Sequence, residues 1–154
     1  MQDRVGLLAL GSPLRWYRPR VGRAQLYALV DVLLDSQAAR SPGPAGRDLL
    51  TVTGLAPGTT VVALTTLTDG RVVEQIADFR RAGHHVIVVE SPAAELLVPP
   101  AGLVEVTARR LWEAEHRAVR RRLVALGIPC VAWDGASPLE AVLFAARPRA
   151  AGRR

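Results

Sequence analysis

The stretch "TVVALTTLTDG", residues 60–70, decides the fold class. Its first part, 60–67, is almost entirely apolar or β-branched, which is typical of a strand buried on both faces of a sheet. Thr68, Asp69 and Gly70 then interrupt this run, and apolar residues at helical spacing follow. We therefore expect a buried strand that ends in a short turn and leads directly into an amphipathic helix.

Strand and helix signals alternate along most of the chain. Gly83 and Gly127 follow helical patterns, as C-terminal caps do, and Pro138 opens the last helix. Two short strands separated by a Gly-Ser-Pro turn suggest an antiparallel hairpin near the N-terminus. Strands are predicted at 4–10, 14–18, 60–67, 84–91 and 128–133, and helices from 22, 70, 108 and 138 onwards.

This alternation predicts an α/β fold with a mostly parallel sheet, an antiparallel hairpin at its edge and helices on both faces. We expect residues 1–147 to form one domain and 148–154 to be a basic, disordered tail. Two helices should each bury an apolar stripe. The stripes comprise Leu26, Leu29, Val30, Leu33 and Leu34 in the first, and Ala108, Leu111, Trp112, Ala118, Val119, Leu123 and Leu126 in the second.

The composition limits the classes of function. Of the 154 residues, 49% are hydrophobic and 22% are charged, which is typical of a globular domain. No apolar run approaches the roughly 20 residues that span a bilayer, and we expect a cytoplasmic protein. Cys130 is the only cysteine, so an internal disulfide and a thiolate zinc cluster are excluded, and we expect a buried, inert thiol.

The net charge of +6 comes from arginine alone, because the sequence has no lysine. Such a balance permits binding to nucleic acid or to an anionic surface without establishing it. Arg120, Arg121 and Arg122 spread through about 200° of a helix, which favours a solvated face over a compact patch. The residues that could contact an anionic surface are Arg120, Arg121, Arg149, Arg153 and Arg154.

Asp69 has two interpretations. It follows a buried strand at the carboxyl edge of the sheet, where open α/β sheets bind their ligands, and a carboxylate there suits a hard cation such as Mg²⁺. Alternatively, Thr68 or Asp69 caps the following helix by accepting a backbone N–H. The stretch alone favours capping.

Other catalytic or metal-binding patterns are weak. His84 and His85 are adjacent on a strand and point to opposite faces, so they cannot ligate one metal ion together. We expect His116 to be helical and exposed. The sequence has no dinucleotide-binding glycine motif, phosphate-binding loop or nucleophile elbow, and we expect a protein that is not an enzyme.

Three stretches together resemble a known family: "RPRVGRAQLYALVDVLL", "FRRAGHHVIVV" and "ARRLWEAEHRAVRRRLVALGIPCVAWDGASPLEAVL". Their order and spacing are similar to the carboxyl-terminal half of the bacterial domain-of-unknown-function family fifty-eight, a branch of the von Willebrand factor A-like proteins. The resemblance implies a Rossmann-like sheet and a protein partner, since genes of this family commonly neighbour those for MoxR-type AAA+ ATPases.

The resemblance also implies that Asp69 occupies an inherited metal-ligand position. The family's principal Asp-x-Ser-x-Ser motif is absent, so the metal site is degenerate, and Mg²⁺ would bind only if an upstream segment supplied that motif. The chain resembles a truncated domain without the first strand and helix. Because unpaired buried backbone is unfavourable, we expect the strand at 4–10 to pair directly with the one at 60–67, in a sheet of about five strands.

Two functions follow as expectations. The first is a non-enzymatic protein-interaction domain that is an adaptor or client of a MoxR-type ATPase. The alternative is a basic protein that binds nucleic acid or an anionic surface, although the few aromatic residues make nucleic acid the weaker of these.

Overall fold

The computed structural model describes residues 4–10, 14–35, 49–91 and 100–146. They belong to two compact units, Met1–Leu55 and Ala56–Arg154, and each unit is described by itself. The predicted tail at 148–154 lies outside the described residues, as do Arg149, Arg153 and Arg154.

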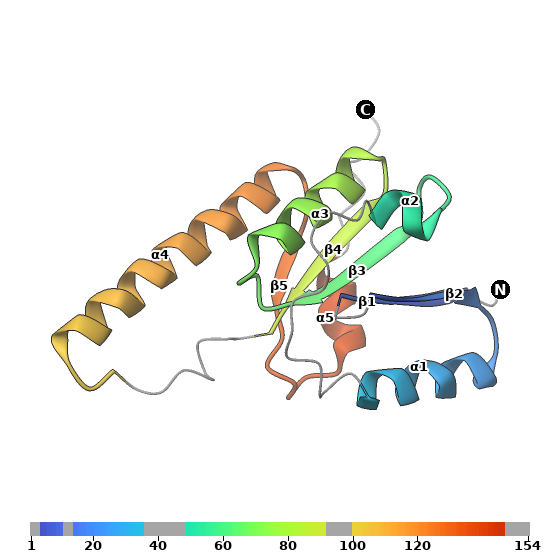
Figure 1. The fold of residues 1–154 in the computed structure, drawn as a ribbon, viewed down its shortest axis with the longest axis horizontal. Helices are drawn as coiled ribbons and strands as arrows, with labels where there is room; N and C mark the ends of the chain where they lie inside the picture. The colour runs from blue at the N-terminus through green and yellow to red at the C-terminus, as the bar shows by residue number, and fades with distance from the viewer. Residues whose placement is uncertain (1–3, 11–13, 36–48, 92–99, 147–154) are drawn as a thin grey trace. The chain divides into compact units, whose positions relative to one another are not determined.

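The first unit contains the expected hairpin. Strands β1 (Val5–Ala9) and β2 (Arg15–Arg20) pair antiparallel, and helices α1 (Arg23–Asp35) and α2 (Leu49–Thr53) follow (Figure 1). The pairing is irregular between Val5 and Leu7, and a Cβ on Gly6 would lie 2.7 Å from the carbonyl oxygen of Tyr17. Only glycine therefore fits at this close approach of the two strands.

The apolar stripe predicted for α1 is largely wrong. Leu29 and Val32 are buried, whereas Leu26, Val30, Leu33 and Leu34 are exposed. The side-chain amide of Gln25 holds the helix to the hairpin by donating to the carbonyl oxygens of Val5 and Arg18, at 3.1 and 3.3 Å. A two-stranded sheet is too narrow to cover a wide helical stripe, so most of this apolar surface stays open.

The second unit is a parallel α/β sheet in the strand order β3-β4-β5. Figure 1 shows α3 and α4 on one side of the sheet and α5 on the other. The α/β class, the parallel sheet and the helices on both faces are therefore confirmed. The elements are β3 (Thr60–Thr65), α3 (Gly70–Arg81), β4 (His85–Glu90), α4 (Leu103–Ala125), β5 (Cys130–Ala132) and α5 (Leu139–Ala146).

The core of this unit lies around β4, the central strand. Val86, Ile87, Val88 and Val89 are all buried, because each of their faces carries helices and each edge carries a strand. Burial of such a side chain stabilises a fold by roughly 1.5–3 kcal/mol. The apolar face of α3 adds Val73, Ile76 and Phe79, which agrees with the amphipathic helix expected after residues 60–70.

β3 corrects the interpretation of the opening stretch. Its residues alternate in exposure, with Val62 40% and Leu64 56% exposed, so β3 is an edge strand and not a strand buried on both faces. Its neighbours in register, Ile87 and Val89, are buried on the same face. The helical cover of that face therefore ends before it reaches β3.

The expected direct pairing of β1 with β3 is also wrong. The described strands form two sheets that share no hydrogen bonds, and the hairpin is not an edge of the parallel sheet. The expectation assumed that unpaired β3 backbone would be buried. Val62 and Leu64 on β3 are instead 40% and 56% exposed, so one face of this strand is not buried.

α4 begins at Leu103, earlier than the predicted Ala108, after Gly102 at its N-cap position. Of the seven residues predicted to face inward, Leu123 is buried while Ala108, Leu111 and Ala118 are exposed. The helix extends beyond the sheet at its N-terminal end, so that part has no sheet surface to cover it (Figure 1).

Both predicted glycine caps are confirmed. Gly83 and Gly127 have φ values of +87° and +74°, and each follows the last turn of a helix. The N–H of Ile128 donates to the carbonyl of Leu123 at 3.1 Å, and the buried side chains of the same two residues complete the cap. These caps reverse the chain into β4 and β5.

Candidate functional site

The first candidate site is the turn that joins β3 to α3. The N–H of Leu67 donates to the hydroxyl of Thr65 at 3.0 Å, and the hydroxyls of Thr66 and Thr68 lie 2.9 Å apart. Leu67 is buried and has a φ of +56°, the left-handed region that non-glycine residues rarely adopt. This conformation turns the chain sharply at the carboxyl edge of the sheet and delivers Asp69 to the start of α3.

Asp69 is the N-cap residue of α3. Its Oδ1 accepts the backbone N–H of Arg71 at 2.9 Å and lies 3.4 Å from the Nε of the same residue. The hydrogen bond from the Arg71 backbone holds the pKa of the Asp69 carboxyl below its usual value, with a smaller contribution from the Arg71 charge. Thr68 bonds to Thr66 through its hydroxyl, so the capping bond belongs to Asp69.

The residues present do not fit a magnesium site. Within the described ranges, no group of three or more His, Cys, Asp or Glu side chains is placed to hold a metal ion. The oxygen of Asp69 that caps the helix also faces a guanidinium group, which repels a cation. One such carboxylate leaves most of the octahedral shell of Mg²⁺ to water.

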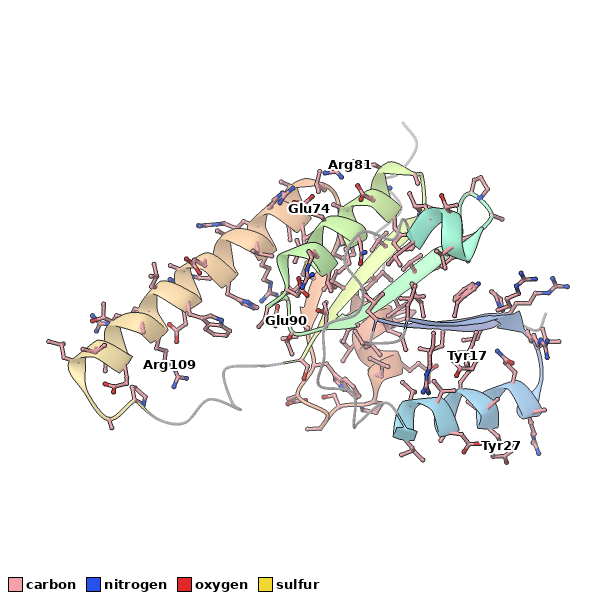
Figure 2. The ribbon with its side chains drawn as sticks, in the orientation of Figure 1. Tyr17, Tyr27, Glu74, Arg81, Glu90 and Arg109 are labelled. Atoms are coloured by element: carbon pink, nitrogen blue, oxygen red, sulfur yellow. The ribbon has the colours of Figure 1, made fainter. Side chains whose placement is uncertain are left out.

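The second candidate site surrounds Glu90, the last residue of β4. Its Oε1 lies 2.6 Å from Nε2 of His116 on α4, and its Oε2 lies 3.8 Å from a guanidinium nitrogen of Arg120 on the same helix. Figure 2 shows Glu90 at the end of the sheet, on the side where α4 lies. Arg120 also donates to the carbonyl oxygen of Cys130 at 3.1 Å, so the cluster joins β4, α4 and β5.

The Glu90 cluster is well shielded from water. The side chains of Glu90 and His116 are 11% and 15% exposed, and the ring of Trp112 stacks on the imidazole at a centroid distance of 5.1 Å. Oε2 of Glu90 is buried without a hydrogen-bond partner among the described residues, and Arg120 compensates its charge from 3.8 Å. Burial raises the pKa of the nearby Cys130 thiol, which keeps it protonated and weakly nucleophilic.

The arrangement therefore acts as a buried electrostatic link and offers no activated nucleophile within the described residues. The expectation that His116 is exposed is wrong, because α4 turns this residue toward the end of β4. Trp112, His116, Val119 and Leu123 follow one helical stripe, and this spacing could have revealed the inward position of His116.

The arginines proposed for anionic contact are only partly available. Arg120 is engaged with Glu90 and Cys130, whereas Arg121 is exposed. Arg122 forms an ion pair with Glu74 at 2.6 Å, and Glu74 also approaches Arg81, which Figure 2 shows on the same helix. Much of the described positive charge on these helices is thus paired with acidic side chains.

Comparison of the chain with models of known protein families, with curated proteins and with solved structures finds no match. None of the described helices has the length and apolar character needed to cross a membrane.

Proposed function

We propose that this chain is a non-enzymatic protein-interaction domain that docks a partner on the N-terminal half of α4. The observation that carries the proposal is the exposure of large apolar side chains there. Leu103, Val104 and Leu111 are 83%, 78% and 61% exposed. A group of large apolar side chains that are exposed close together on one helix is typical of an interaction site.

The exposed residues have the geometry of a docking helix. Val104, Leu111 and Ala118 recur at heptad spacing, and Ala108 lies between the first two on the same side. The exposed Glu115 interrupts this row between Leu111 and Ala118. The apolar residues of the row lie away from the stripe of Trp112, His116 and Leu123 that faces the sheet. An amphipathic helix presents such a row to a hydrophobic groove or to another helix of its partner.

Another side of this helical segment carries charged side chains. Arg109 and Glu113 form an ion pair at 3.3 Å, one turn apart, and Arg117 lies 4.0 Å from the same glutamate. These charges keep one side of α4 in water while the apolar row remains available. The segment can therefore be soluble alone and still bury its apolar row in a complex.

The choice of partner rests on the resemblance to the domain-of-unknown-function family fifty-eight. We propose a MoxR-type AAA+ ATPase, for which this chain would be an adaptor or client. The same resemblance supports a Rossmann-like, von Willebrand factor A-like assignment for the parallel sheet, with a degenerate metal position at Asp69 and no metal or cofactor requirement in this chain.

Co-purification of the chain with a MoxR-type ATPase tests this function. The Leu111→Glu variant should lose at least about tenfold in affinity, because a carboxylate would have to be buried in an apolar contact. Val124→Glu is the matched control, since Val124 is an exposed apolar residue on another side of the same helix. Absence of binding by the unmodified chain, or equal binding by both variants, would contradict the proposal.

A further inference from the structure

The outer edge of β3 carries a row of backbone groups with no strand beside it in the described part of the chain. The carbonyl oxygens of Thr59 and Thr65 accept the N–H groups of His85 and Ser91, both at 3.1 Å. Because the N–H and C=O groups of alternate residues point to opposite edges, Val61 and Ala63 also face β4. The backbone groups of Thr60, Val62 and Leu64 therefore face outward.

The side chains of these three residues share one face of the sheet, and all three are exposed. Val62 and Leu64 are apolar, so an extended segment placed along this edge would gain backbone hydrogen bonds and apolar contact together. These outward-facing backbone groups favour a β-strand as the binding partner, because the backbone groups within a helix are already paired with each other.

The edge also lacks the features by which proteins prevent strands from pairing with copies of themselves. Residues 60–65, "TVVALT", contain no charge and no proline, and β3 pairs with β4 in a continuous register without a bulge. Lysine, proline and bulges are the usual obstacles to edge-to-edge pairing. Two copies of β3 would therefore meet without like-charge repulsion at the strand itself.

We infer that β3 pairs with β3 of a second copy of this chain, antiparallel and centred on Val62, so that the two parallel sheets become one continuous sheet. In this register Val62 lies opposite its own copy, and Thr60 lies opposite Leu64 of the second copy. Each pair exchanges both of its N–H···O bonds, since all these residues present their backbone groups outward.

The symmetry of this arrangement is closed. A two-fold axis perpendicular to the sheet brings Val62 and Leu64 of both copies together on the same face, where they form one apolar cluster. The interface uses neither α4 nor the ATPase proposed above, so the inference goes beyond the proposed function and can succeed or fail independently of it.

Sedimentation equilibrium of the full chain across concentration tests the inference. We expect a dimer with twice the 16.5 kDa chain mass. Val62→Lys should raise the dimer dissociation constant by at least about tenfold, because two ammonium groups would face each other at the axis. Val124→Lys is the matched control, an exposed apolar residue remote in sequence from β3 and outside the docking row of α4, and it should leave the dimer intact.

Hydrogen exchange of the unmodified chain provides a second readout that does not depend on the folding of a variant. In the dimer, the N–H groups of Val62 and Leu64 should exchange as slowly as those of Val61 and Ala63, which already bond to β4. Dilution to the monomer should accelerate exchange of the Val62 and Leu64 N–H groups and leave exchange of the Val61 and Ala63 N–H groups unchanged. A monomer at every concentration, a dimer unaffected by Val62→Lys, or fast exchange of Val62 and Leu64 in the dimer would overturn the inference.

Discussion

The carboxylate of Glu90 and the imidazole of His116 meet at the carboxyl end of β4, with Oε1 and Nε2 only 2.6 Å apart. This contact fixes the middle of α4 against the central strand, while the N-terminal end of the helix extends past the sheet. Both side chains are shielded from water. The contact therefore gives Oε1 of Glu90 and Nε2 of His116 a hydrogen-bond partner that each would otherwise lack.

Removal of this contact should destabilise the fold. We expect His116→Ala to lower the free energy of unfolding by about 1–3 kcal/mol, because Glu90 would keep a buried carboxylate without its hydrogen bond. Urea denaturation measures the change. His85→Ala is the control, since His85 is exposed on the same strand, and it should cost less than about 0.5 kcal/mol. Equal effects of the two substitutions would show that the contact contributes little.

The Asp69 cap should make a contribution that depends on pH. At pH 7, Asp69→Ala should lower the free energy of unfolding by about 1 kcal/mol through loss of the bond to the Arg71 N–H. The pKa of Asp69 is lowered in the folded chain, so this stabilisation is present above the pKa of the unfolded state and is lost as pH falls through the folded pKa.

The cost of Asp69→Ala should therefore shrink between pH 5 and the acid range where the folded carboxyl becomes protonated. Asp69→Asn is the matched variant, because asparagine caps a helix without titrating. Its stability relative to the unmodified chain should improve as the pH falls. Urea denaturation at several pH values measures both variants, and a constant cost of Asp69→Ala would contradict the role of the charge.

The sequence predicted elements better than it predicted their burial. β4, α3 and the two glycine caps rest on local signals, such as the apolar run of 86–89 and the position of Gly83, and the structure confirms them. The burial of β3 and of the α1 stripe was wrong, because exposure depends on whether another element covers the same face. A strand at the edge of a sheet and one at its centre can have equally apolar sequences.

The candidate site shows the same limit. Asp69 stood out because it follows a strand directly, and its capping bond joins residues that are close in the sequence. The contact between Glu90 and His116 was missed, because it requires α4 to return across the end of β4 in a particular rotation. Sequence periodicity indicates which helical face points inward, but it does not indicate which strand residue that face will meet.

The two glycine caps should respond differently to alanine. Both positions have positive φ, so Gly83→Ala and Gly127→Ala should each cost about 1–2 kcal/mol. A Cβ at Gly83 would enter open space, whereas one at Gly127 would lie 3.3 Å from a guanidinium nitrogen of Arg80. Arg80 also donates to the carbonyl of Leu126 at 3.2 Å, and this bond would be disturbed. Thermal or urea denaturation should therefore find Gly127→Ala the less stable variant, and the opposite order would contradict this steric argument.

Leu67 combines a buried side chain with a left-handed backbone, and these two properties make opposing demands on substitution. Leu67→Ala should lower the free energy of unfolding by about 2–5 kcal/mol, because it empties a buried position and keeps the unfavourable φ. Leu67→Gly loses the same contacts but adopts positive φ without strain. We therefore expect the glycine variant to be at least as stable as the alanine variant in urea denaturation.

Leu123, which is buried in the regular helix α4, provides the control. There the Leu123→Gly variant should be less stable than Leu123→Ala by about 1 kcal/mol. The same order at both positions would show that the turn after β3 does not hold Leu67 in the left-handed conformation in solution.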